Sequence, residues 1–132
     1  MILGIGTDLV DTERLACMVE QYGDRFLERI FTRREVETAE MRATLSQRLG
    51  TRFAAKEATM KALGTGWRGG VHFTQIEVRK HPTGRPEIVL SGAAKARADE
   101  MGVTGIHVSL SHEGQRALAV VIVEGEGAEK HP

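Results

Sequence analysis

The sequence has few of the residues and patterns that mark several common classes of protein. Cys17 is the only cysteine, which excludes an intramolecular disulfide and a cysteine-rich zinc site and is typical of the reducing cytosol. The histidines lack a zinc-binding spacing such as HExxH, and aromatic residues, at 5% of the chain, offer no stacking platform for single-stranded nucleic acid. We therefore set aside zinc chemistry and nucleic-acid binding.

Charge and hydropathy exclude further classes of partner. Lys and Arg together number 18, as do Asp and Glu, so attraction to an acidic partner must come from a local arrangement of charge. No apolar run approaches the roughly 20 residues of a membrane span, and the start of the chain lacks the features of a signal peptide. The 132 residues suffice for one domain with its own core, and we expect a soluble cytoplasmic protein that does not bind membranes.

Periodicity and capping signals predict a small single α+β domain. The patterns predict strands at 2–10, 72–80, 86–90, 105–112 and 117–123, and helices at 11–22, 33–42, 45–63 and 92–101. Asp11 can cap the first helix, Thr32 and Glu35 form a capping box, and Gly64 ends the long helix. The last strand is apolar enough to be central in an antiparallel sheet packed against the long helix. We expect this domain to cover 1–124.

The polar, Gly-rich residues 125–132 are expected to form a disordered tail.

The first strand has one face without bulky side chains. Period-two alternation places Leu3, Ile5, Thr7 and Leu9 on one face and Gly4, Gly6 and Asp8 on the other. The second face therefore lacks bulk just before a carboxylate. It could accept either a ligand or another backbone.

The long helix carries a charged cluster within FAAKEATMKALGTG, residues 53–66. Its core-facing stripe consists of Leu49, Phe53, Met60 and Leu63. Glu57 lies only about 40° from Phe53, so it sits at the edge of the core and needs a compensating partner. Lys61 is the simplest partner, because an ordinary i, i+4 surface pair is worth about 0.2 to 0.5 kcal/mol. The pattern alone favours this pair; the alternative is that the cluster is half of a site.

Asp8 gives the second interpretation a specific form. Asp8 and Glu57 could together supply oxygen ligands to Mg²⁺, which completes its shell with waters and phosphate oxygens. The combination would imply a phosphate-bearing substrate. The loop GTGWRGG, 64–70, could approach phosphates with backbone N–H groups or could simply end the helix.

A second polar pattern lies in the segment GIHVSLSH. His107, Ser109 and Ser111 share one strand face and His112 follows them, so donors suited to a diphosphate lie together. The alternative, a half-exposed strand without a ligand, is favoured by the pattern alone.

Three segments together resemble one enzyme family: GIGTDLVDTERL at the start, RFAAKEATMKALGTG in the middle, and HVSLSH before the last apolar strand. The chain is similar to the holo-(acyl-carrier-protein) synthases, a family of 4′-phosphopantetheinyl transferases, from Met1 to about Glu124. The resemblance implies the transferase fold. It also implies transfer of 4′-phosphopantetheine from coenzyme A to a serine of apo acyl carrier protein, in fatty acid biosynthesis, with adenosine 3′,5′-bisphosphate as the second product.

The resemblance also implies roles for individual residues. Asp8 and Glu57 would hold Mg²⁺, and Lys61 would stabilise the diphosphate or help to take the serine proton. We favour a metal-held water as the base, because an ammonium beside phosphates stays protonated. Lys56 points about 60° to the other side of Phe53 and is given a supporting role. Coenzyme A contacts are implied at Lys61, Arg85, Pro86, Ser111 and His112.

Partners follow from the same resemblance. Acyl carrier proteins are acidic, and the matching basic candidates here are Arg14, Arg25 and Arg29. Composition alone does not support this face, because residues 11–42 contain six arginines and eight acids. The family also implies a homotrimer whose sites are shared between protomers.

Two other functions remain as alternatives. A coenzyme A binding module without transfer activity would not need two metal-binding carboxylates, so Asp8 and Glu57 favour the enzyme. A surfactin-type transferase, which is similar to two copies of this fold in one chain, is disfavoured by length.

Overall fold

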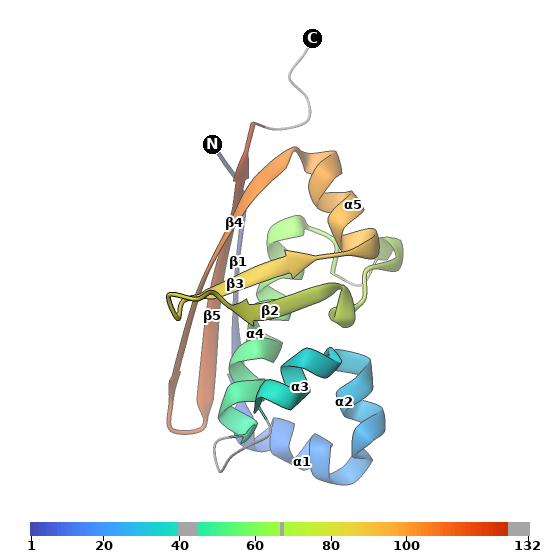
Figure 1. The fold of residues 1–132 in the computed structure, drawn as a ribbon, viewed down its shortest axis with the longest axis vertical. Helices are drawn as coiled ribbons and strands as arrows, with labels where there is room; N and C mark the ends of the chain where they lie inside the picture. The colour runs from blue at the N-terminus through green and yellow to red at the C-terminus, as the bar shows by residue number, and fades with distance from the viewer. Residues whose placement is uncertain (40–44, 67, 127–132) are drawn as a thin grey trace.

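The computed structural model describes residues 1–39, 45–66 and 68–126, which form a sheet, a hairpin and five helices (Figure 1). The elements are β1 (Ile2–Asp11), α1 (Thr12–Tyr22), α2 (Asp24–Ile30), α3 (Arg33–Ala39), α4 (Leu45–Leu63), β2 (Ile76–Lys80), β3 (Pro86–Leu90), α5 (Gly92–Met101), β4 (Val103–Glu113) and β5 (Arg116–Gly125). Short 3₁₀ turns lie at Arg68–Gly70 and Phe73–Gln75.

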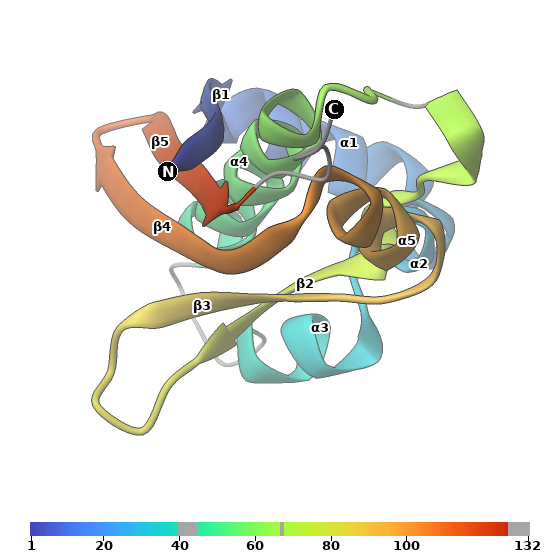
Figure 2. The same cartoon turned by 90° about the horizontal axis from the view of Figure 1, so that it is seen from above.

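The predicted fold class is confirmed, with β5 central as expected. β1, β5 and β4 form an antiparallel three-stranded sheet in the order β1-β5-β4. The single sheet expected from the sequence is two sheets, because β2 and β3 pair only with each other. α4 lies inside the curve of the three-stranded sheet, and α1, α3 and β2 also contact it (Figure 2).

α4 is buried around most of its circumference, which explains its composition. Its buried alanines are Ala54, Ala55, Ala58 and Ala62, and the predicted stripe residues Leu49, Met60 and Leu63 are also buried. Small side chains let a helix and a strand approach closely. The helix ends at Gly64, whose φ of 71° is the left-handed conformation that glycine adopts at low cost.

The bulk-free face of β1 accepts the backbone of α4. A Cβ added to Gly6 would lie 1.9 Å from the carbonyl oxygen of Ala58, and one added to Gly4 would lie 2.1 Å from that of Ala62. The opposite face of the strand is open, with Ile5 and Leu9 each 59% exposed. Of the two occupants that the sequence allowed, the structure shows another backbone.

Most helix boundaries agree with the expectations, including both caps. The Asp11 carboxylate accepts hydrogen bonds from the first turn of α1, and Glu35 and Thr32 bond each other's backbone N–H groups as a capping box. The helix α2 was not predicted, since its short sequence lacks a clear period. The part of the 33–42 helix beyond Ala39 lies outside the described residues.

Three predictions at the ends of strands need correction. The strand predicted at 72–80 begins only at Ile76, because Phe73–Gln75 form a 3₁₀ turn. Leu3 packs toward the core rather than with Ile5, because the β1–β5 register shifts between Ile2 and Gly4. β5 continues to Gly125, whose N–H and C=O both bond Met1, so the predicted tail began too early. Residues 127–132 and Trp67 lie outside the described residues.

Among the described residues, no helix combines the length and apolar character needed to cross a bilayer.

We expect Gly6→Ala to destabilise the protein strongly. Its new methyl group would overlap the Ala58 carbonyl, and overpacking of this kind costs about 1 to 3 kcal/mol. Gly105→Ala in β4 is the matched control, because its Cβ would meet only the end of the Glu124 side chain, at 3.1 Å. Urea unfolding should show a lower free energy of unfolding for Gly6→Ala and a change below about 0.5 kcal/mol for the control. Equal stability of the two variants would contradict the close contact.

Candidate active site

The structure brings Asp8 and Glu57 together from two elements that are far apart in the sequence. Asp8 follows Gly6 on the face of β1 that touches α4, and Glu57 precedes Ala58, the residue that Gly6 contacts. Partial burial raises the pKa of Glu57, the neighbouring Asp8 carboxylate raises it further, and the Lys61 ammonium acts in the opposite direction. The two acids are therefore close enough to repel each other.

Lys61 joins the same group of charges. Its Nζ donates to Asp8 Oδ1 at 3.1 Å and to the carbonyl oxygen of Thr7 at 2.9 Å. The lysine side chain is 55% exposed, and the Asp8 side chain is 18% exposed. Lys61 therefore links α4 to β1, a contact that an ordinary surface pair within one helix does not explain.

Asp8 also lines a cavity of about 360 Å³ between β1, α1 and α2. The cavity is walled largely by apolar side chains, among them Met18, Phe26 and Phe53. Arg14 lies at the same cavity. Of the three arginines proposed for carrier binding, Arg14 is thus placed beside the carboxylates, while Arg25 and Arg29 lie exposed on α2.

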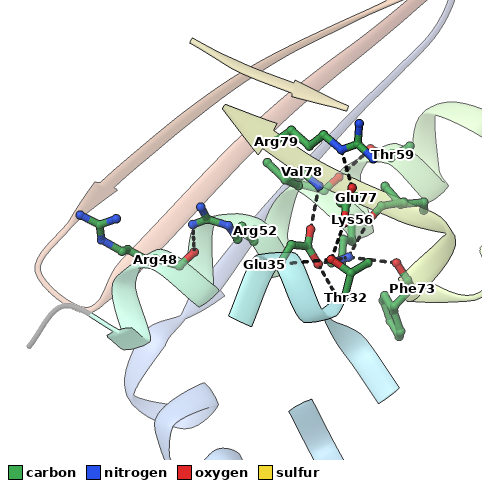
Figure 3. Close-up of polar contacts among 12 residues, drawn as sticks. Thr32, Glu35, Arg48, Arg52, Lys56, Thr59, Phe73, Glu77, Val78 and Arg79 are labelled. Atoms are coloured by element: carbon green, nitrogen blue, oxygen red, sulfur yellow. Dashed lines mark hydrogen bonds and ion pairs between the residues drawn. The ribbon is translucent and has the colours of Figure 1, made fainter. Parts of the chain in front are cut away.

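Lys56 lies apart from these carboxylates, although it precedes Glu57 in the sequence. Its ammonium is fully buried and forms an ion pair with Glu35 at 2.8 Å (Figure 3). The supporting role expected for Lys56 stays a prediction, since this pair lies outside the carboxylate cluster.

A second cavity, of about 400 Å³, lies between the start of α4, the β2–β3 hairpin and the end of β4. Its basic lining residues are Arg48, Arg52, Arg79, Lys80 and His112, and among the described residues no acidic side chain lines it. Charged donors gathered in this way favour a phosphate-bearing ligand. We refer to this cavity as the basic cleft.

Arg52 gives the basic cleft a specific feature. Its Nε is buried and has no hydrogen-bond partner among the described residues. Its Nη1 donates to the carbonyl oxygen of Arg48 at 3.1 Å. Burial lowers the pKa of the Arg52 guanidinium, Glu35 opposes this effect, and Arg48 adds to it. A bound anion would both accept a hydrogen bond and compensate the buried charge.

Only some of the residues that were predicted to contact coenzyme A line the basic cleft. Pro86 and His112 line it, whereas Arg85 lines a separate cavity of about 580 Å³ between β3 and β4. Ser111 is exposed on the outer face of the sheet and is not part of either lining. His107, on the same outer face, pairs with Glu124 at 2.8 Å.

The sequence analysis did not identify the arginines of the basic cleft as candidate binding residues. The spacing of Arg48 and Arg52 by four residues places them on one face of α4, which was an available signal. Arg79 and Lys80 come from β2, and nothing in the sequence predicts how the hairpin crosses the helix.

Comparisons with known proteins identify the family. Residues 4–121 match the model of the 4′-phosphopantetheinyl transferase superfamily. A holo-[acyl-carrier-protein] synthase of Koribacter versatilis is 47% identical over 124 residues, which are 94% of this chain and 99% of that protein. The chain belongs to the 4′-phosphopantetheinyl transferase superfamily.

Solved structures support the same assignment. The holo-[acyl-carrier-protein] synthase of Neisseria meningitidis superimposes with a TM-score of 0.86 at 37% identity, covering 94% of this chain and 99% of that one. The Helicobacter pylori synthase, solved in complex with coenzyme A, gives a TM-score of 0.80 at 32% identity, covering 91% and 99%. This chain covers almost the full length of both synthases, each of which is a single copy of the fold. The comparisons therefore do not support the two-copy surfactin type.

Proposed function

We propose that Asp8 and Glu57 hold a Mg²⁺ ion during the reaction that this superfamily member catalyses. The chain is a holo-(acyl-carrier-protein) synthase: it transfers 4′-phosphopantetheine from coenzyme A to a serine of apo acyl carrier protein in fatty acid biosynthesis. The observation that carries the metal assignment is the close packing of β1 on α4 at Gly6 and Ala58, which brings Asp8 and Glu57 to the same place beside Lys61.

The donors at this point fit Mg²⁺. Both are carboxylates, which this ion prefers, and the Lys61 ammonium shows that a cation is already stabilised beside Asp8. Within the described residues, no group of three or more His, Cys, Asp or Glu side chains forms a complete metal site. Two protein ligands leave room for the waters and phosphate oxygens that Mg²⁺ retains.

Bound there, Mg²⁺ would ligate the diphosphate of coenzyme A and neutralise the charge that develops on the leaving phosphate. Lys61 adds a mobile positive charge at the same place, since its exposed side chain can turn from Asp8 toward a phosphate. We assign Lys61 to charge stabilisation rather than to proton removal, because an ammonium beside phosphates is held in its protonated form by their charge.

Asp8→Asn and Glu57→Gln should each lower kcat at least about 100-fold with little change in the melting temperature, because each removes one charged ligand and almost no volume. Transfer is measured as the mass gain of apo acyl carrier protein during incubation with coenzyme A across a Mg²⁺ titration. Direct Mn²⁺ binding supplies a readout without turnover. Glu113→Gln, an exposed acid at the end of β4, is the control. Near-normal rates in either Asp8→Asn or Glu57→Gln would refute the metal assignment.

We assign the phosphates of coenzyme A to the basic cleft, and the site as a whole to two neighbouring protomers. Arg52 and Glu57 lie about 140° apart around α4 at 100° per residue, and Asp8 lines a different cavity from the basic cleft. A second copy that brings its basic cleft to these carboxylates would complete the site. This arrangement supports the homotrimer that the family resemblance implies.

The outer face of the three-stranded sheet offers a surface for such association. Ile5 and Leu9 of β1 are each 59% exposed, and Leu118 of β5, which pairs with Leu9, is 38% exposed. Contiguous exposed apolar side chains of this kind are typical of protein–protein interfaces.

Shared sites predict complementation between two inactive variants. Asp8→Asn damages the carboxylates, while Arg52→Met combined with His112→Ala damages the basic cleft. After the two proteins are unfolded together and refolded in equal amounts, about a quarter of wild-type activity should return, because random pairing leaves that share of sites intact. A trimer without recovery would place both halves in one protomer, and a monomeric mass would contradict the assembly.

The carrier protein is assigned to the surface formed by α1 and α2. Arg14 lies at the cavity that Asp8 lines, and the exposed Arg25 and Arg29 extend the positive charge along α2. The apolar wall of that cavity offers a place for a carrier side chain next to the reacting serine. The cytoplasmic location remains a prediction from the sequence.

Charge reversal tests this surface. Arg14→Glu combined with Arg25→Glu should raise KM for the acidic carrier at least tenfold more than KM for coenzyme A, since it opposes encounter with one substrate only. The difference should shrink as salt rises, because exposed charges are screened over about 8 to 10 Å at moderate ionic strength. Lys95→Glu on α5, at the other end of the molecule, is the control (Figure 1). An equal loss for both substrates would count against this docking surface.

A further inference from the structure

Lys56 is fully buried, and each N–H donor of its ammonium has an acceptor. Its Nζ lies 2.8 Å from Glu35 Oε1 and donates to the carbonyl oxygens of Phe73 at 3.0 Å and Ile76 at 2.5 Å. An ammonium has three N–H donors, so these three acceptors use its full capacity. The Phe31 ring adds a cation–π contact at 5.7 Å.

Glu35 is equally buried and connects two backbone N–H groups, from the α3 cap and from β2, to this ammonium. Its Oε1 accepts the N–H of Thr32 at 2.9 Å, which begins α3, and its Oε2 accepts the N–H of Val78 at 2.7 Å, in β2 (Figure 3). The carboxylate is therefore held on both oxygens by backbone groups. Because its position is determined in this way, the Lys56 ammonium has a fixed point to bind.

The side of α4 toward β1 has no large side chain that would fix its rotation, because it is made of alanines, such as Ala58 and Ala62, against the glycines of β1. The buried Leu49, Met60 and Leu63 restrain the helix on its other sides, and the Lys56 ammonium adds a directional contact to that packing. A rotation of about 10° would move a side-chain end at a radius of 5 to 6 Å by about 1 Å. Misplacement on that scale can cost about 100-fold in rate.

We propose that the Glu35–Lys56 pair is a positioning pair for the transfer reaction: it sets the rotation of α4 so that Glu57 faces Asp8. The proposal rests on the assignment of Asp8 and Glu57 to the metal. Lys56 and Glu57 are adjacent, so a fixed Lys56 Cα–Nζ direction determines, 100° away around the helix, the direction of the Glu57 side chain.

Stability alone does not account for an ion pair at this place. Replacing a buried ion pair with neutral side chains of similar volume is often neutral or stabilising, because two desolvated charges recover little free energy beyond their cost of burial. Burial lowers the pKa of Lys56, which is the sign of that cost, and the Glu35 carboxylate opposes the shift. The charges instead fix the orientation of the Lys56 side chain, since three acceptors hold its ammonium at once.

The test separates positioning from stability with the double variant Lys56→Met/Glu35→Gln, which removes both charges and keeps the volume. We expect a folded protein whose kcat, measured well below its melting temperature, is at least tenfold lower than wild type. Its Mn²⁺ affinity should fall at least fivefold, while KM for the carrier stays within twofold. A kcat and a Mn²⁺ affinity within twofold of wild type would overturn the proposal.

Glu77→Gln is the matched control. Glu77 joins Thr32 of the α3 cap to Arg79 of β2 at the same junction, but it makes no hydrogen bond or ion pair to α4 among the described residues. This variant should lower the melting temperature and leave Mn²⁺ affinity unchanged. Its kcat should also be unchanged when measured at saturating coenzyme A, a condition that is needed because Glu77 pairs with Arg79 of the basic cleft. If the variant reduces kcat and Mn²⁺ affinity as strongly as the double variant does, the effect belongs to general loosening of the junction and the proposal fails.

A further variant keeps the proposal testable if the double variant does not fold. Glu35→Asp retains the charge and withdraws the carboxylate by one methylene, so a positioning role predicts a lower kcat in a folded protein. Glu57→Gln measured in parallel distinguishes the two assignments. If Glu57→Gln is active, the metal assignment fails; if Glu57→Gln is inactive but Glu35→Asp and the double variant are normal, only the positioning pair fails.

Discussion

The contact between the backbone of β1 and the backbone of α4 is the constraint on which the site depends. A single added methyl group at Gly6 would lie 1.9 Å from the Ala58 carbonyl oxygen, so the strand and the helix are as close as two such elements can be. This closeness places Asp8, two residues after Gly6, and Glu57, one residue before Ala58, within electrostatic reach of each other. The same contact requires alanine on the side of the helix toward β1, so no large side chain fixes the rotation of the helix on that side.

The charged residues of α4 lie in two rows that run along the helix at four-residue spacing, and the second row begins with the apolar Phe53. One row, Arg48, Arg52 and Lys56, leads from the basic cleft into the buried junction with α3 and β2. The other, Phe53, Glu57 and Lys61, runs beside β1 from the apolar cavity to the carboxylate pair. Each row has its own counter-charge, Glu35 for the first and Asp8 for the second. The division explains how one helix can serve as an anion-binding surface and a cation-binding surface without cancelling either charge.

The sequence predicts local structure well here because local signals are strong and consistent. The cap at Asp11, the capping box of Thr32 and Glu35, and the terminating Gly64 are all observed, and α4 has its predicted bounds. What could not be predicted depends on packing between distant segments. The capping box uses one oxygen of Glu35, and nothing in the sequence shows that the same carboxylate also binds Lys56, 21 positions later. The cleft was missed for the same reason, since it needs the crossing of β2 over α4.

The alternation of β1 links the site to association between copies. Residues of even number between Gly4 and Asp8 face α4, whereas Ile5 and Leu9 face outward on the exposed apolar surface. β1 cannot shift to pack better on its outer face without disturbing the packing on its inner face, because the contact with α4 has no free space. In the assembly that we propose, a second copy packed on Ile5 and Leu9 therefore presses on the strand that carries Asp8. Burial of the outer face would then hold the carboxylate against Glu57 from one side, as the Glu35–Lys56 pair holds Glu57 from the other.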